Sequence, residues 1–499
     1  MQTGLWLLGL LGLLGDLLIL VLGFGLVWVV YAYVVDSRQT RHTIRRNYPV
    51  IGRFRYLFEH MGVFFRQYFF AQDREEMPFN RADRTWVYRA AKRNSLNIAF
   101  GSTRDIDKPG TPIFLNAFLP VSADNHEEPA LLTFGPDCPN PYSTRSIFNI
   151  SAMSFGALSA PAVEALSRGA ALAGCWLNTG EGGLSPYHLA GGCDLIYQIG
   201  TAKYGVRDAN GCLDEGKLKQ MAEQPQVKMF EIKLSQGAKP GKGGILPADK
   251  VTEEIAAIRH IPVGEASISP NSHTEVRSVP DLLDMIGRVR SATGKPTGIK
   301  FVLGEHQWLT ELCLLIGERG HDVAPDFITL DSGDGGSGAA PQPLMDNTGL
   351  PIKESLPYLI ALLKKHGLRE RVKVIVAGKL ITPSAVAMAF CAGADAVNSA
   401  RGFMFALGCI QALQCNKNTC PTGITTHNKR LQRGLVPADK AVRVAQYQEQ
   451  MTESVAMIAH SCGVTEPRQL QPKHVRLVTS PGHSAPMIEY VMLQESSSK

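Results

Sequence analysis

Two runs of sequence decide the fold: Val374-Ile-Val-Ala-Gly-Lys379 and Cys391-Ala-Gly-Ala-Asp-Ala-Val-Asn-Ser-Ala-Arg-Gly402. Each run holds a short apolar stretch that ends in small and polar residues, as a buried strand does where it meets a loop. Between them, Thr382-Pro-Ser384 is a typical helix start. A strand, a loop, a helix and a second strand in this order predict a βα unit of a parallel sheet.

The same alternation extends towards the N-terminus. Each apolar run is followed by a loop rich in Gly, Ser, Thr or Asn and then by a more helical segment. Eight such units predict an α/β fold, a closed (β/α)8 TIM barrel, with an open doubly wound sheet as the alternative. The predicted strands are 146–152, 175–178, 229–233, 265–268, 298–302, 327–330, 372–376 and 396–398.

The loops after the seventh and eighth strands predict a phosphate site. In such barrels these two loops commonly bind phosphate. Gly378 and Gly402 would let backbone amides approach an anion, and Lys379 or Arg401 would add positive charge. Glycine is also ordinary in βα turns, so the site is a prediction.

Three cysteines follow the second of these loops. Cys409, Cys415 and Cys420 have the spacing C-x5-C-x4-C, and Pro421 follows the last of them. Zinc sites usually have four ligands in two C-x2–4-C halves. Three thiolates fit an iron–sulfur cluster better, although cysteine is also common in apolar cores. Their position beside a phosphate site favours the cluster.

The N-terminal residues predict a membrane helix. Residues 17–35 form an uncharged apolar run, long enough to span a bilayer. A signal peptide is the rival, but no basic residue precedes Arg38. The arginines follow the run, so the positive-inside rule predicts a single-pass protein of the inner (cytoplasmic) membrane with its catalytic domain in the cytoplasm. Asp16 is either functional within the membrane or at its far interface.

The rest of the chain divides by composition. We expect a membrane segment over 1–36, a juxtamembrane helical region over 37–99, the barrel over 100–438 with a cysteine loop at 409–420, and a helical tail over 439–499 packed on the barrel. Residues 56–72 are rich in aromatic side chains, which would lie either on a membrane surface or against the soluble domain. The net charge of +6 and the lack of a Lys/Arg block beyond the membrane-proximal stretch argue against nucleic acid as a partner, and the ten cysteines show no disulfide framework.

Several motifs together resemble one family, the FMN-binding synthase domain of glutamate synthases, in a stand-alone form with a membrane segment. The matching runs are Ser151–Ser159, Asn178–Gly183, Lys233–Gly244, Asp334–Gly338 and the cysteine triplet. The resemblance implies FMN and a [3Fe–4S] cluster on the three cysteines. It also implies reductive amination of 2-oxoglutarate through 2-iminoglutarate.

Candidate site residues follow from the loops and from this resemblance. Ser154, Glu181 and Lys300 are the candidate catalytic residues, and Lys233, Gln236 and Lys239 suit a dicarboxylate substrate. Asp331 and Asp334 either contact the flavin chain or cap turns, and His188 and His273 are expected to be structural. The candidate cofactor-binding residues are Met153, Ser154, Thr179, Gln198, Lys300, Gly333, Gly335, Gly378, Lys379, Arg401 and Gly402.

The chain departs from the family pattern in three places. It begins Met-Gln-Thr, without the N-terminal cysteine of a glutaminase domain, and no G-x-G-x-x-G follows a strand. Ammonia would therefore be free, come from a separate amidotransferase, or not be used at all. Electrons would come from an external donor, either ferredoxin-like or a membrane redox partner. The phosphate loop reads Ala-Gly-Lys where the family more often has Gly-Gly.

Two other functions remain open at this stage. One is a related flavin oxidoreductase acting on another amino acid or an N-methyl amino acid. The other is a membrane-tethered flavin and iron–sulfur electron-transfer module that does not act on a small molecule.

Overall fold

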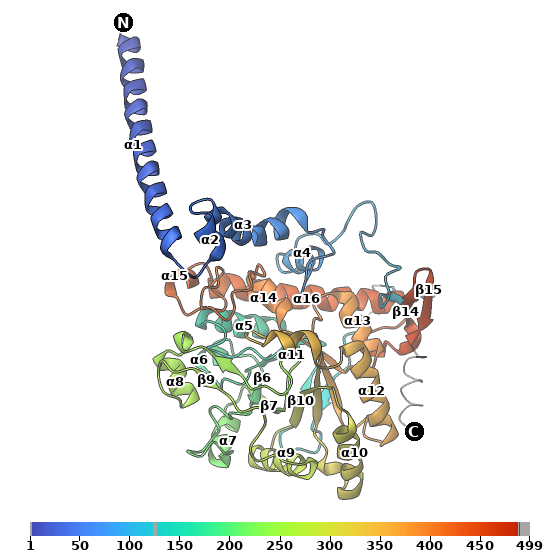
Figure 1. The fold of residues 1–499 in the computed structure, drawn as a ribbon. Helices are drawn as coiled ribbons and strands as arrows, with labels where there is room; N and C mark the ends of the chain where they lie inside the picture. The colour runs from blue at the N-terminus through green and yellow to red at the C-terminus, as the bar shows by residue number, and fades with distance from the viewer. Residues whose placement is uncertain (1, 123–126, 488, 490–499) are drawn as a thin grey trace. The chain divides into compact units, whose positions relative to one another are not determined.

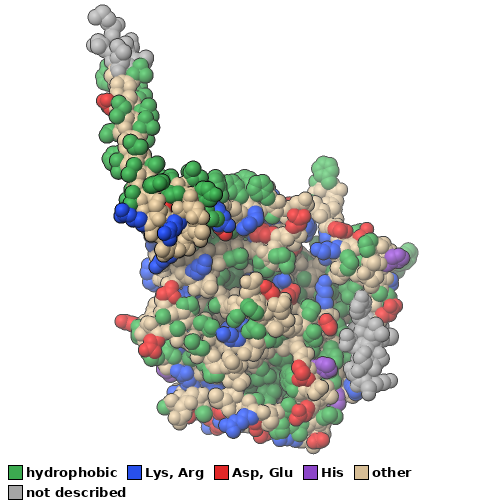
Figure 2. All heavy atoms as spheres, in the orientation of Figure 1, with side chains coloured by type: hydrophobic (Ala, Val, Ile, Leu, Met, Phe, Trp, Pro, Cys, Tyr) green, Lys and Arg blue, Asp and Glu red, His purple; other side chains and the backbone are tan. Residues whose placement is uncertain are grey.

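The computed structural model describes residues 2–122, 127–487 and 489 and divides into two units, Met1–Ala82 and Asp83–Lys499. The first unit contains α1 (Gln2–Arg38), α2 (Thr43–Asn47), α3 (Gly52–Phe65) and the π-helix η1 (Arg66–Phe70). In α1, the stretch Gly9–Arg38 contains an 18-residue window with a mean hydropathy of 2.5, so by length and composition this helix could cross a membrane. Figure 2 shows apolar side chains along this helix.

The second unit is built on a closed barrel of eight parallel strands (Figure 1). This confirms the predicted (β/α)8 fold and excludes the open sheet. Each strand pairs with its two neighbours in the ring, and β13 closes it by pairing with β4. In ring order the strands are β4 (Phe148–Ile150), β5 (Leu177–Asn178), β6 (Leu195–Ile199), β7 (Val227–Lys233), β10 (Thr297–Val302), β11 (Phe327–Asp331), β12 (Lys373–Ala377) and β13 (Ala396–Ser399).

One predicted strand is wrong. The run 265–268 contains β9 (Ser267–Ile268), which pairs antiparallel with β8 (Ile245–Leu246) outside the barrel. The third barrel strand is β6, which the sequence analysis missed. All five residues of β6 are buried, and such a strand carries neither an alternating pattern nor much length to identify it.

Helices surround the barrel and the C-terminal segment packs against them (Figure 1). The long helix α16 (Pro437–Ser461) contacts α5 (Ala160–Ala173), α13 (Pro383–Cys391) and α14 (Arg401–Leu407), which agrees with the predicted packing on the barrel. Beyond α16 the described tail continues through two short 3-10 helices, η5 (Pro467–Gln469) and η6 (Pro472–His474). It then forms β14 (Val475–Ser480) and β15 (His483–Pro486), in a sheet with β1 (Pro112–Phe114), and not the helical tail that was expected. The other helices are α4 (Arg81–Ala90), α6 (Pro186–Leu189), α7 (Glu215–Ala222), α8 (Glu253–Arg259), α9 (Val279–Thr293), α10 (Gln307–Arg319), α11 (Gln342–Asn347), α12 (Ile352–Lys365) and α15 (Lys429–Gln432).

A short hairpin closes the N-terminal end of the barrel. It consists of β2 (Leu132–Phe134) and β3 (Tyr142–Thr144). The ring of Phe134 lies 5.8 Å from that of Trp176 and 5.7 Å from that of Phe327, all three fully buried. Burying each such ring contributes about 1.5–3 kcal/mol. With this end plugged, the C-terminal ends of the strands are the open end, where barrel enzymes place their chemistry.

Candidate active site

A cavity opens among the loops that follow the barrel strands, with an empty volume of about 1070 Å³ including its mouth. Predicted site residues from six different segments of the chain meet in its wall. These are Met153, Ser154, Glu181, Gln198, Lys233, Gln236, Lys239, Arg401 and Cys415. The other predicted residues do not line it: Thr179, Lys300, Gly333, Gly335, Gly378, Lys379, Gly402, Cys409 and Cys420.

The carboxylate of Glu181 is held between two lysines. Its Oε2 lies 3.0 Å from Lys233 Nζ and its Oε1 lies 3.8 Å from Lys239 Nζ. Lys233 Nζ also donates to Gln236 Oε1 at 2.6 Å. Burial alone would raise the pKa of Glu181, but Lys233, Lys239 and Arg259 lower it to about 2. Glu181 is therefore an ionised acceptor at neutral pH, and it orients the two ammonium groups.

Glycine makes room for this cluster. A Cβ on Gly244 would lie 2.5 Å from Glu181 Oε1, and one on Gly200 would lie 2.6 Å from Glu181 Cβ. Gly180 has a φ of +69°, and a Cβ there would lie 2.8 Å from the backbone nitrogen of Ser154. Glycines in the loops after the second, third and fourth strands thus allow close packing around Glu181 and Ser154.

Arg259, at the end of α8, lines the cavity although the sequence analysis missed it. Its guanidinium donates to the carbonyl of Phe155 at 3.2 Å and lies 5.1 Å from the ring centre of Tyr204. Its Nε is buried without a hydrogen-bond partner, which leaves a donor free in the wall of the site. Arg259 lies in a helical segment without a recognisable motif, so nothing in the sequence indicated that this arginine is buried in the cavity wall.

Glu231 is a second missed residue. It lies on β7 and is fully buried. It accepts hydrogen bonds from Gln198 Nε2 at 2.6 Å, from Asn178 Nδ2 at 2.8 Å and from Thr329 Oγ1 at 2.5 Å. The Gln198 amide, a predicted flavin contact, is therefore held by the carboxylate of its partner residue on the neighbouring strand, which also accepts from β5 and β11.

Two ion pairs join β10 to β11 and the loop after β11 to the loop after β12. Lys300 Nζ lies 3.7 Å from Asp331 Oδ2, and that carboxylate also accepts the backbone N–H groups of Gly237 and Ser332. These contacts agree with the turn-capping role for Asp331. Lys379 Nζ lies 3.3 Å from Asp334 Oδ2.

Each of the two loops predicted to bind phosphate contains a tightly packed glycine. Gly378 has a φ of +119°, and a Cβ there would lie 2.3 Å from Ser332 Cβ. A Cβ on Gly402 would lie 2.1 Å from the hydroxyl of Tyr447. Ala400 and Arg401 line the cavity, and the guanidinium of Arg401 donates to the carbonyl of Ser337 at 3.3 Å.

The cysteine loop follows α14 and adjoins the cavity through Cys415. Burial raises the pKa of the Cys409 thiol to about 11. Burial also acts to raise the pKa of Cys420, but hydrogen bonds from Thr422 and Thr425 outweigh it and lower that pKa. Among the described residues, no group of three or more His, Cys, Asp or Glu side chains is arranged to hold a metal ion. The thiols of this loop therefore do not form a preassembled site in this structure.

The backbone of the cysteine loop is irregular. Gln411, Leu413 and Asn418 all have positive φ values, between 54° and 58°. Such values are uncommon for residues with a side chain, above all for a bulky one, and they cluster at functional sites. The loop is fastened by Tyr88, whose hydroxyl donates to the carbonyl of Cys409 at 2.6 Å.

The two histidines fit the structural role expected for them. His188 is buried, with Nδ1 2.8 Å from Ser185 Oγ and Nε2 2.9 Å from the carbonyl of Met153. His273 Nε2 lies 2.9 Å from the carbonyl of Lys233. Burial lowers the pKa of each to about 4, so both rings are neutral at pH 7. They hold the loops that carry Met153 and Lys233.

Comparison with known proteins gives a consistent result. Residues 119–465 match the family described as the conserved region in glutamate synthase. The glutamate synthase large subunit-like protein YerD of Bacillus subtilis is 39% identical over 493 residues, which cover 91% of this chain and 93% of that protein. The archaeal-type glutamate synthase [NADPH] of Thermotoga neapolitana is 32% identical over 326 residues, 63% of this chain and 59% of that protein.

Two further comparisons mark the limits of the likeness. The archaeal glutamate synthase [NADPH] of Methanocaldococcus jannaschii is 32% identical over 330 residues, and the chain spans 61% of its length. Among solved structures, a mutant flavocytochrome b2 with benzoylformate has a TM-score of 0.47 and 18% identity, with 80% of each chain covered. The match over residues 119–465 and the near full-length likeness to YerD show that this chain belongs to the glutamate synthase family and is an oxidoreductase of that type.

Proposed function

We propose that the protein is a membrane-anchored glutamate synthase that reductively aminates 2-oxoglutarate to glutamate through 2-iminoglutarate. It would use FMN, a [3Fe–4S] cluster and electrons from an external donor. The observation that carries the proposal is the charge of the cavity. Five cationic side chains and one carboxylate line it: Lys233, Lys239, Lys250, Arg259, Arg401 and Glu181. The excess of positive charge suits two anionic occupants, a phosphorylated flavin and a dicarboxylate.

The dicarboxylate would bind at the Glu181 end of the cavity. Lys233 and Lys239 are both more than nine-tenths buried, and Glu181 neutralises one positive charge of the pair. Arg259 adds a guanidinium with an unpartnered Nε. Charged hydrogen bonds in a buried site are stronger than neutral ones, so these groups can hold two carboxylates and keep the α-carbon in one place.

The residues around the cavity fit FMN. The flavin would supply hydride chemistry when bound. Arg401, whose guanidinium lines the cavity and donates to the carbonyl of Ser337, would bind the phosphate. Ser154 and the Gln198 amide, held by Glu231, offer polar contacts to the ring from the first and third strands. The remaining candidates, Thr179, Lys300, Gly333, Gly335, Gly378, Lys379 and Gly402, would act by holding the loops that form this surface.

Lys250 supports an anionic cluster on Cys409, Cys415 and Cys420. Its ammonium is almost completely buried, and it donates to the carbonyls of Cys415 and Ala157. Among the described residues, no carboxylate lies within 4.0 Å of it. A buried charge without a counter-charge is costly. Three thiolates around iron would supply that counter-charge at the edge of the cavity.

Turnover tests the proposal. The full chain, purified without oxygen, would be given 2-oxoglutarate, ammonium chloride and reduced methyl viologen, and glutamate would be measured. Formation of glutamate supports the proposal. If the reduced flavin is oxidised by glycine-derived imines or N-methyl imines but not by 2-oxoglutarate with ammonia, the substrate assignment is wrong. A flavin whose redox state ignores all of them would indicate an electron-transfer module.

The cluster and the anchor are tested separately. Iron and acid-labile sulfide are expected in the purified protein and in Cys212→Ser, and they should be lost in Cys415→Ser. Equal iron in both variants would rule out the cysteine loop. For the anchor, α1 should keep the protein in the membrane pellet after alkaline carbonate washing. Release by carbonate would show that α1 does not span the bilayer.

A further inference from the structure

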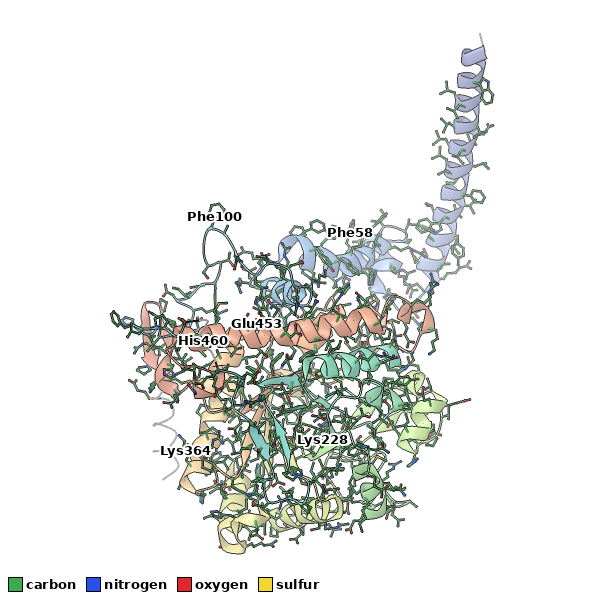
Figure 3. All side chains as sticks on the ribbon, turned by 180° about the vertical axis from the view of Figure 1, so that it is seen from behind. Phe58, Phe100, Lys228, Lys364, Glu453 and His460 are labelled. Carbon is green, nitrogen blue, oxygen red and sulfur yellow. The ribbon has the colours of Figure 1, made fainter. Side chains whose placement is uncertain are left out.

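The helical segment formed by α3 and η1, residues 52–70, has one apolar face. Aromatic and aliphatic side chains recur along it at intervals of three and four residues, which places them on one side of the helix. Phe58 is 63% exposed and Phe69 is 75% exposed. We call this set the aromatic face; its members are Phe54, Leu57, Phe58, Met61, Phe65, Tyr68 and Phe69. Figure 3 labels Phe58 on α3.

The aromatic face is ordered by contacts along itself. The rings of Phe54 and Phe58 are 6.4 Å apart, and those of Phe65 and Phe69 are 5.7 Å apart. Each of these four side chains is nevertheless at least one-third exposed. The surfaces of soluble proteins rarely present so many large apolar side chains together, and such a face indicates an interaction surface.

Contacts within the first unit fix α3 beside the end of α1. Asp36, in the last turn of α1, is fully buried. Its Oδ2 accepts from Arg53 Nε at 2.7 Å and from the backbone N–H of Val50 at 3.1 Å, and its Oδ1 accepts from Arg45 Nη2 at 2.6 Å. A Cβ on Gly52 would lie 2.8 Å from the carbonyl of Ile44, so the connection is tightly packed. The start of α3 is thereby placed at the depth where α1 ends.

The charges around the aromatic face indicate its occupant. Residues 37–70 contain seven arginines, no lysine and one acidic residue, Glu59. Arg38, Arg41, Arg46, Arg55 and Arg66 are exposed. Two copies of such a segment would repel each other, whereas an anionic phospholipid surface attracts it by about 1 kcal/mol per basic residue. On the helix itself Arg53, Arg55 and Arg66 flank the aromatic face. Apolar side chains flanked by basic ones are typical of helices that lie in a membrane interface.

We infer that α3 and η1 lie flat in the interface of the same bilayer, with the aromatic face among the acyl chains and the arginines on anionic lipid phosphates. This inference rests on the proposed membrane anchoring by α1. It adds a second attachment, parallel to the membrane surface. A protein anchored by a single helix can rotate and tilt about that helix. A second attachment through residues 52–70 would restrict this motion in the segment that precedes Asp83.

Photo-crosslinking tests the inference on the full chain. The protein would be reconstituted into vesicles of phosphatidylcholine and phosphatidylglycerol with p-benzoylphenylalanine in place of Phe58, Glu59 or Leu20, each in a separate preparation. After illumination, mass spectrometry would identify lipid and protein adducts. Phe58 and Glu59 are neighbours on different sides of α3, and both are exposed. We expect several-fold more lipid adducts at position 58 than at position 59.

The probe at position 20, within α1, distinguishes failure of the interfacial helix from failure of the membrane anchor. Lipid adducts at 20 with no excess at 58 over 59 would overturn the interfacial helix and leave the anchor in place. Lack of lipid adducts at 20 would overturn the anchor itself. Adducts at 58 with the same chain or with a second copy would show that protein covers the aromatic face. A Phe58→Asp/Phe69→Asp variant should remain in the membrane pellet through α1 but become accessible to protease between residues 52 and 70.

Discussion

The ammonium of Lys250 donates a hydrogen bond of 2.9 Å to the backbone carbonyl of Cys415 and one of 3.3 Å to that of Ala157. It thereby links the loop after the first barrel strand to the cysteine loop, about 260 residues further along the chain. Lys250 lies in the wall of the cavity, and so does Cys415. One buried positive charge is therefore shared by the proposed flavin site and the proposed cluster site.

Lys250→Met should separate the two proposed effects of this charge. We expect the variant to fold, because methionine fills a similar volume and an uncompensated buried charge is removed. Iron content should fall, and the midpoint potential of the remaining cluster should decrease, since a nearby positive charge favours the reduced form. An EPR-monitored redox titration measures both. Lys242→Met, at an exposed lysine of the neighbouring loop, is the control. An unchanged potential in Lys250→Met would contradict the assignment.

Lys233→Met should weaken binding of the dicarboxylate substrate. A charged hydrogen bond to a carboxylate contributes about 1.5–3 kcal/mol, so KM for 2-oxoglutarate should rise about 10- to 100-fold. Lys228 lies on the same strand, at the protein surface, 3.7 Å from Asp194 (Figure 3). Lys228→Met should leave KM unchanged. KM is measured by steady-state kinetics with a reduced dye as the electron donor. An equal rise of KM in the two variants would indicate a general loss of stability and not a lost substrate contact.

Glu181 should make the stability of the protein depend on acid. Its pKa in the folded state is about 2, against 4.5 in an unfolded chain. The stabilisation is therefore complete above pH 4.5 and is lost as pH falls towards 2, at a total of about 3 kcal/mol. Urea unfolding of Glu181→Gln should show a shallower loss over this pH range than the parent protein. Glu265→Gln, at an exposed carboxylate, should behave like the parent. A parallel decline in all three proteins would count against the ion-pair cluster.

Gly378→Ala should disturb the loop after the seventh strand. The added Cβ would meet Ser332 at 2.3 Å, and a φ of +119° is unfavourable for alanine. We expect a loss of more than about 1 kcal/mol in stability, together with a reduced flavin content. Gly317→Ala is the matched control, because no atom lies within 4 Å of its Cβ position in α10. Flavin absorbance per protein and thermal unfolding measure the two effects, and full flavin content in Gly378→Ala would show that this loop does not support the cofactor.

Much of the fold could be predicted from the sequence because it depends on short-range patterns. The runs ending at Gly378 and Gly402 each contain a buried strand and its turn, and their adjacent order identified the last two βα units. The apolar length of α1 and the arginines that follow it were equally visible. The failures occurred where a local pattern was weak. The buried strand β6 lacks alternation, and β9 has strand-like residues but pairs only with another short strand.

The site depended on contacts that a linear reading does not contain. Glu181 follows the second strand and meets Lys233 and Lys239 from the fourth because the third strand pairs with both and all three end at the same end of the barrel. The pairing of β6 with β7 places Glu231 directly beside Gln198, and the packing of α8 brings Arg259 into the cavity wall. The sequence by itself determined which side chains the loops carry, because those loops have recognisable residues at the strand ends. Tertiary structure decided which charges face each other, because ion pairing and desolvation depend on distances between segments that are far apart in the chain.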